Sequence, residues 1–214
     1  MKLCKAIILV AVATLTLTSQ CFSECAGGFG PINASKVLPN QGKNNYSTSN
    51  LTDLNPNTIW AASFDGNPIY LHINTDFNYD ESPIFGIYIR NGYQRDQKSL
   101  INNSRVKEIK IYANSVGNLW TKATLPDVKN LPKYTYYTSS EEEIYCNPKD
   151  KKYDGFMNDG LCDEETYQYV ELPYESPAVK GKRITTIIIE IISVYPGKKW
   201  NDICISDIAY LRGC

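Results

Sequence analysis

Residues 87–114 read IYIRNGYQRDQKSLINNSRVKEIKIYAN, and they are the most informative stretch of the chain. Ile87 and Ile89 alternate with polar or half-polar neighbours, and an apolar alternation resumes between Val106 and Ile111. A period of two is typical of half-buried strands. A polar segment separates the two runs, so the stretch predicts a strand, a loop and a second strand.

The loop between these runs combines flat hydrogen-bond donors with one aromatic ring. Guanidinium groups donate hydrogen bonds, and amides both donate and accept them, so the set suits a polar ligand such as a sugar. The alternative for the charged residues is an ordinary solvated loop. The candidate ligand-binding residues of this loop are Tyr93, Arg95, Lys98, Asn103 and Arg105.

Trp200 is a further candidate, because it follows a Pro-Gly-Lys-Lys turn where an exposed indole is expected. An aromatic ring in such a turn can stack on the apolar face of a pyranose. Lys198 or Lys199 in the same turn would meet the charge of an acidic sugar. Tyr93, Arg95 and Trp200 are therefore the leading candidates for contact with a glycan.

Short extended runs recur along most of the chain, separated by Asn, Gly, Pro and Asp, and the helical period of 3.6 is nearly absent. Repeated short strands with turn signals between them predict an all-β sandwich. The abundance of tyrosine, 16 residues against 6 phenylalanines, is typical of such extracellular β proteins. The runs are 69–73, 85–90, 106–112, 167–172, 183–193 and 203–212.

The segment 123–165 does not follow this pattern. It is rich in tyrosine and in acidic residues, and we interpret it as a long insertion between two strands. Irregular segments of this length are either functional or merely tolerated. The insertion is therefore a candidate surface for a protein partner.

The cysteines that follow the N-terminal segment indicate that the protein resides in an oxidising compartment. Export favours disulfides, and the ends of a domain often lie close together, so we expect a bridge between Cys25 and Cys214. A second bridge, between Cys146 and Cys162, would staple the insertion. Cys204, within an apolar strand, is then a buried free thiol.

Residues 1–23 are expected to form a secretory signal. Lys2 and Lys5 provide its positive start, and the apolar run 6–17 is too short to span a bilayer. Cleavage after Ser23 would leave residues 24–214 as one domain that is secreted, periplasmic or held at the outer surface. A lipoprotein cleaved before Cys21 is the alternative. No later apolar run is long enough to span a membrane.

Charge and histidine content argue against two function classes. The formal net charge of −1 provides no basic excess, so nucleic acid is not an expected partner. The chain has one histidine, His72, in a strand-like run, and nothing pairs it with a nucleophile. A carboxylate pair for glycoside hydrolysis stays open, because any Asp or Glu could take part. We expect a protein without catalytic activity.

Three blocks of the chain resemble discoidin-like domains of the coagulation factor 5/8 type C family. The segment 50–60 is similar to the family's N-x-x-D-G-x-x-x-T-x-W, with Leu54 in place of the glycine. The segments 91–107 and 195–207 are similar to two motifs of a bacterial subgroup, the NADase-type glycan-binding domain. The resemblance spans roughly 35–114 and 168–214. It implies a galactose-binding-like jelly-roll β-sandwich that binds carbohydrate without cleaving NAD.

The first block also raises the question of a structural calcium ion. Asp53, Thr58 and Asp207 could together supply oxygen ligands, which Ca²⁺ prefers. The alternative is that Asp53 caps the following Asn-Pro turn through its own backbone. Trp60, at the end of the block, is expected in the core and not on a binding surface. No other cofactor is expected.

These observations together predict a secreted, non-catalytic carbohydrate-binding module that acts on a glycan of a cell surface or host matrix. The first alternative is a protein-binding adhesion module that uses the Tyr-rich acidic insertion. The second is a structural envelope protein.

Overall fold

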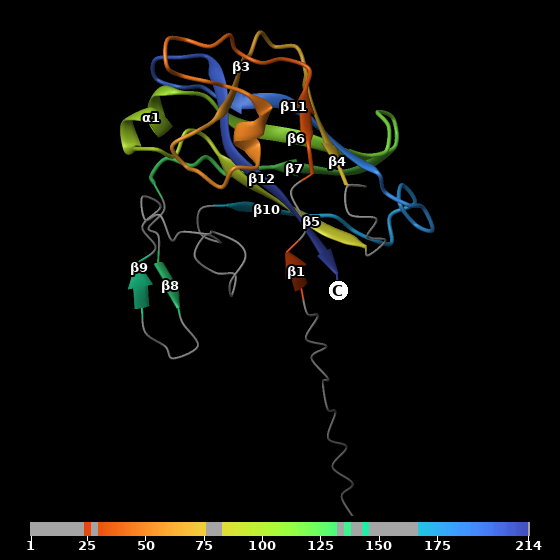
Figure 1. Cartoon of the computed structure of the whole chain (residues 1–214). Helices are drawn as coiled ribbons and strands as arrows, with labels where there is room; N and C mark the ends of the chain where they lie inside the picture. The colour runs from red at the N-terminus through yellow and green to blue at the C-terminus, as the bar shows by residue number, and fades with distance from the viewer. Residues whose placement is uncertain are drawn as a thin grey trace, which may run out of the picture.

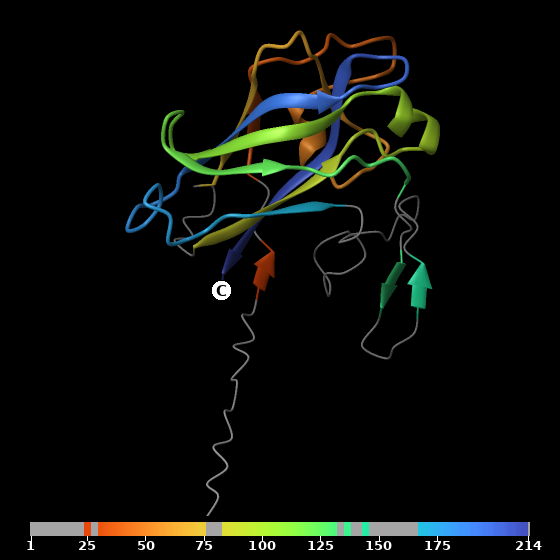
Figure 2. The same ribbon diagram turned by 180° about the vertical axis from the view of Figure 1, so that it is seen from behind.

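The computed structural model describes residues 24–26, 30–75, 83–131, 135–137, 143–145 and 167–213. Two antiparallel sheets pack face to face, so the fold is the expected all-β sandwich (Figures 1 and 2). Among the described residues, no helix has the length and apolar content needed to cross a membrane.

The first sheet has the order β1–β12–β5–β10, and β3 also pairs with β12. Cys25 of β1 lies opposite Arg212, so the start and the end of the domain are adjacent, as expected (Figure 1). The strands are β1 (Glu24–Ala26), β3 (Trp60–Ser63), β5 (Ile84–Asn91), β10 (Gln168–Glu171) and β12 (Asp202–Gly213).

The second sheet has the order β2–β4–β11–β6–β7. Its strands are β2 (Ile32–Ala34), β4 (Ile69–Asn74), β6 (Arg105–Ala113), β7 (Leu119–Thr124) and β11 (Thr186–Tyr195). Two further strands, β8 (Thr135–Tyr137) and β9 (Glu143–Tyr145), pair with each other. Each of the six runs identified in the sequence contains a strand, although β11 begins three residues after the predicted start of its run.

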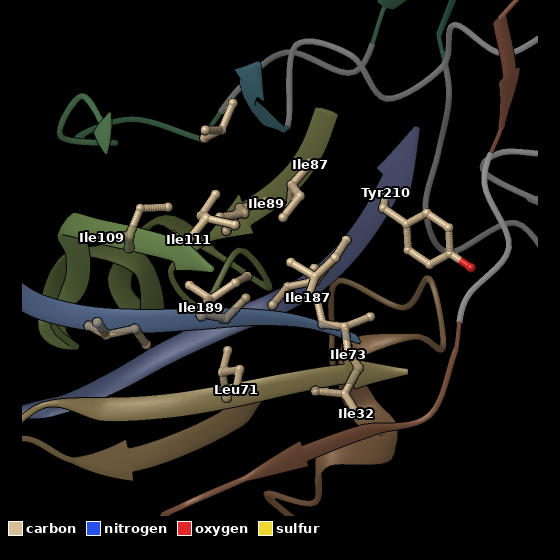
Figure 3. Close-up of a cluster of buried hydrophobic side chains, with 14 of the residues drawn as sticks. Ile32, Leu71, Ile73, Ile87, Ile89, Ile109, Ile111, Ile187, Ile189 and Tyr210 are labelled. Carbon is tan, nitrogen blue, oxygen red and sulfur yellow. The ribbon is translucent and has the colours of Figure 1, made fainter. Parts of the chain in front are cut away.

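Alternation of side chains along the strands builds the core. In β4, Ile69, Leu71 and Ile73 are buried, whereas the residues between them are partly exposed. Figure 3 shows isoleucines of β5 opposite those of β6 and β11, so the two sheets share one apolar layer. Each fully buried isoleucine contributes about 1.5–3 kcal/mol of transfer free energy. Trp60 lies in this core with no exposed surface, as expected, and its indole N–H donates to the Lys36 carbonyl.

The quoted stretch crosses from one sheet to the other, because β5 and β6 belong to different sheets. The Asn91 side chain joins the two sheets where the chain crosses between them. Its amide donates to the Val106 carbonyl and accepts from the Val106 N–H, both at 2.8 Å. Between the strands lies a short helix that sequence periodicity did not predict, α1 (Gln97–Asn102), at one end of the sandwich (Figures 1 and 2).

Two glycines allow the loops at this end to pack closely. Gly92 has a φ of 91°, and a Cβ there would lie 2.7 Å from Leu100 Cδ1. Gly197 lies in the β11–β12 turn, where a Cβ would meet the Asn102 carbonyl oxygen at 2.4 Å. Both positions therefore need glycine to hold the α1 end together.

The predicted insertion begins later than residue 123. β7 extends through Thr124, and Leu125 is buried in the core, so the first residues of 123–165 belong to the sandwich. A 3-10 helix, η1 (Thr48–Leu51), is the second short helix of the described chain. The residues predicted as a signal, 1–23, lie outside the described part of the chain.

The two predicted disulfides also fall outside the described residues. The positions of Cys146, Cys162 and Cys214 are not described, and neither is the side chain of Cys25. Cys204 is buried and free, as expected from its apolar surroundings. Burial raises the pKa of its thiol well above the ordinary value, so the group stays protonated.

Candidate functional site

A cleft of about 650 Å³ opens at the α1 end of the sandwich. Three connections that are distant in sequence form it, since they all lie at this end of the sandwich. They are the β2–β3, β5–β6 and β11–β12 connections. Such loop-built clefts at the end of a rigid sandwich are common binding sites. Its lining includes Lys43, Asn44, Asn45, Tyr46, Asn57, Tyr93, Arg95, Asp96, Lys98, Asn102, Asn103, Lys199, Trp200 and Asp202.

Tyr93 stands half-buried in the cleft wall. Its ring packs against a small apolar cluster around Ile59 and Cys204, and its hydroxyl donates to the Asn57 carbonyl at 3.1 Å. Desolvation raises the pKa of Tyr93 above its ordinary value, although the nearby Arg95 charge opposes the shift. The ring is therefore a neutral aromatic surface in a fixed orientation.

Arg95 lies over this ring, with its guanidinium carbon 4.7 Å from the ring centroid. Nη1 donates to the Tyr93 hydroxyl at 2.9 Å, Nη2 to Ser99 Oγ at 3.0 Å, and Nε to Asp96 Oδ2 at 3.0 Å. A guanidinium has five N–H donors, so these three bonds leave two for a ligand. The group is held in place before any ligand binds.

Asp96 connects this arrangement to α1. Its carboxylate accepts the Ser99 N–H at 2.6 Å and so caps the helix. That backbone hydrogen bond lowers the pKa of Asp96, and the hydrogen bond from Arg95 lowers it further. The carboxylate is thus ionised and already engaged within the protein.

Trp200 enters the cleft from the β11–β12 turn and is 49% exposed. Its backbone is fixed on α1, because its N–H donates to the Asn102 carbonyl at 2.8 Å. The Lys199 ammonium lies 4.7 Å from the ring centroid. An exposed indole on a fixed backbone can stack on a sugar at little entropic cost.

Lys98 and Asn103 also line the cleft, but they differ in availability. Lys98 is exposed on α1, and among the described residues no hydrogen bond or ion pair holds its ammonium. The Asn103 amide donates to the Ser99 carbonyl at 2.8 Å, which ties the end of α1. Lys98 is therefore free to contact a ligand, whereas part of Asn103 serves the helix.

Arg105 does not line the cleft, and this corrects the sequence-based expectation. It is 6% exposed, and its Nε donates to Asp127 at 2.7 Å. Nη1 donates to the carbonyls of Leu100 and Asn103 at the end of α1. Arg105 thus positions the helix from behind and does not face a ligand.

The three residues considered for calcium do not fit a metal site. Asp207 is fully buried and accepts from Arg90 Nη1 at 2.9 Å, so a cationic partner already neutralises it. Asp53 accepts from the Thr58 hydroxyl at 2.7 Å and from the Asn55 N–H at 3.0 Å. A calcium ion would have to displace these bonds beside a buried guanidinium, at high electrostatic cost.

The arrangement matches the alternative, in which Asp53 caps its own turn. Asp207 also stabilises this turn, because its Oδ1 accepts the Leu54 N–H at 2.9 Å. Leu54 has a φ of 57°, the left-handed conformation for which the resembling motif uses glycine. No cluster of three His, Cys, Asp or Glu suited to a metal occurs in the described ranges.

Sequence reasoning missed the β2–β3 side of the cleft. Lys43 to Tyr46 carry no apolar period, so nothing local marks them as part of a site. Asn50 holds this side, because its buried amide donates to the carbonyls of Asn45 and Ile59 at 2.9 and 2.7 Å. Because Asn50 opens the motif-like segment 50–60, the sequence could have indicated that it stabilises this side of the cleft.

Several solved structures are similar to this chain at low identity. CBM32-3 from a family 31 glycoside hydrolase of Clostridium perfringens is 13% identical over 87% of this chain and 91% of that chain, with a TM-score of 0.49. A fragment of a putative chitobiase from Bacteroides thetaiotaomicron is 11% identical over 92% and 96%, with a TM-score of 0.48. Chitosan-binding module 1 from Paenibacillus sp. IK-5 is 10% identical over 86% and 96%, with a TM-score of 0.40.

No curated protein matches the chain. A family model does match, and it covers nearly the whole described domain. Its description is "NAD glycohydrolase translocation F5/8 type C domain", and the match extends over residues 24–211.

Proposed function

The chain belongs to the NAD glycohydrolase translocation F5/8 type C domain family, and from that premise we propose that it is an exported, non-catalytic glycan-binding module. One observation supports this most directly. The cleft presents an aromatic ring with a stacked guanidinium at Tyr93 and Arg95, together with an exposed indole at Trp200. A pyranose has an apolar face for stacking and hydroxyls for hydrogen bonds, and this cleft offers both kinds of contact.

Asparagine amides complete the polar part of the cleft. Asn44, Asn57 and Asn102 are among its lining residues, and an amide both donates and accepts, as a sugar hydroxyl does. The thiol of Cys204 is buried with a raised pKa, so it is a poor nucleophile. These features favour recognition of a sugar over chemistry on it.

The test is a glycan array probed with the protein and with Trp200→Ala. Trp200 is suited to this test because its side chain is half exposed and only its backbone bonds to α1. We expect the variant to keep its melting temperature and to bind about tenfold more weakly, since an aromatic contact is worth on the order of 1.4 kcal/mol.

Tyr174→Ala is the matched control, because Tyr174 is 57% exposed and does not line the cleft. It should bind as the unaltered protein does. If the folded protein binds no glycan, or if both variants bind normally, the cleft is not a glycan site. A protein partner of the insertion would then be the next hypothesis to test.

A further inference from the structure

Positive charge is concentrated in the cleft although the whole chain has a formal net charge of −1. Two acidic side chains, Asp96 and Asp202, accompany four basic ones. The basic residues come from three different connections, since they lie before β3, around α1 and before β12. They are Lys43, Arg95, Lys98 and Lys199.

The two acids are occupied inside the protein. Asp96 accepts from Arg95 and from the Ser99 backbone, as described above. Asp202 accepts from the Ser63 hydroxyl at 3.0 Å. Within the described chain, neither acid forms an ion pair with a lysine of the cleft.

The lysines, by contrast, are available. Among the described residues, the ammonium groups of Lys43 and Lys98 form no ion pair or hydrogen bond, and the Lys199 ammonium lies against the Trp200 ring without an ion pair. Elsewhere on the surface, Lys36 and Lys180 each pair with a carboxylate at 2.8 Å. The cleft therefore keeps cations that have no internal partner.

From this we infer, on the basis of the glycan-binding function proposed above, that the ligand is an acidic glycan whose carboxylate or sulfate group is held by Arg95 with Lys98 and Lys199. The Arg95 guanidinium is held by three internal bonds and keeps two donors, so it can bind an anion with little loss of entropy. The lysines would add attraction that is sensitive to salt.

The test compares acidic glycans with their neutral counterparts. Hyaluronan and carboxyl-reduced hyaluronan isolate the carboxylate, and keratan sulfate and its desulfated form isolate the sulfate. Poly-glutamate serves as a polyanion without sugar. Affinities would be measured by biolayer interferometry at low and high NaCl. We expect at least one acidic glycan to bind about tenfold more tightly than its neutral form, with the difference shrinking in high salt.

Two variants locate the effect in the cleft. Lys98→Gln and Lys199→Gln should each weaken binding of the acidic glycan about threefold, and should each reduce its advantage over the neutral form. Lys122→Gln, an exposed position on β7 away from the cleft, is the control and should change neither.

The outcomes separate this inference from the function on which it rests. If neutral glycans bind as tightly as acidic ones, the inference is wrong and glycan binding stands. Equal binding of poly-glutamate, or acidic binding unaffected by both lysine variants, would also overturn the inference. If no glycan of either kind binds, the proposed function fails as well.

Discussion

Replacing Asp207 by Asn should strongly destabilise the protein, because it removes one charge of a fully buried pair. Asp207 and Arg90 are joined at 2.9 Å, and neither side chain is exposed to solvent. The substitution keeps the shape of the side chain and an oxygen for the Leu54 N–H. What it removes is the negative charge that balances the Arg90 guanidinium.

The size of the effect follows from the burial of that guanidinium. A buried charge that loses its partner costs about 3–5 kcal/mol. For a domain of this length, 1 kcal/mol shifts the melting temperature by about 2–4 °C, so a fall of about 10 °C is expected. Urea denaturation followed by circular dichroism would measure the free energy of unfolding, and calorimetry would measure the melting temperature.

Asp65→Asn is the matched control, because Asp65 pairs with Lys36 at a similar distance of 2.8 Å but on the surface. The hydrogen bond from Lys36 lowers the pKa of Asp65 to about 2. Water nevertheless screens this exposed pair, so its loss should leave the melting temperature at neutral pH almost unchanged. If Asp207→Asn were as mild as Asp65→Asn, the view that a buried charge pair supports the Leu54 turn would be refuted.

Two further predictions concern stability. Asn114 has a φ of 63°, and its side chain bonds to the backbone at Thr185 and Arg183, so Asn114→Ala should cost about 2–3 kcal/mol in urea denaturation. Asn114→Gly, which accepts the positive φ, should cost about half as much, and equal losses would contradict this account. Burial raises the pKa of the Cys204 thiol above its ordinary value of 9.0. The protonated thiol therefore favours the folded state, and stability should fall as the pH rises above about 9. Cys204→Ala should show a smaller fall than the unaltered protein in denaturation measured across this range, and an identical fall would count against the assignment.

The strands could be predicted from sequence because their signal is local. In β4, buried apolar residues recur with a period of two, and β11 carries an almost continuous buried apolar run, so both can be read directly from the sequence. α1 has only six residues and no comparable period. It depends on the Asp96 cap and on Arg105 donating to the carbonyls at its end, and the Arg105 orientation depends on Asp127. These contacts form only when the chain has folded.

The residues of the cleft, like the elements of the fold, could be predicted from the sequence only in part. Tyr93, Arg95 and Trp200 could be nominated from the sequence, because aromatic and planar donor groups beside Gly-containing turns are unusual enough to notice. The sequence could not show that Arg105 faces inward, since its partner Asp127 lies 22 residues away and the two arginines look alike in the chain.

The sequence by itself therefore determined the β-sandwich, the family and the chemical types of the candidate residues, because each of these follows from local pattern or motif. Only the tertiary structure decided which residues share a cleft. It brings Lys43, Arg95 and Lys199 to the lining of one cleft, and it neutralises Asp207 with Arg90. The physical reason is that the charge and the exposure of a site depend on residues that are distant in sequence. Only folding sets the distances in space between those residues.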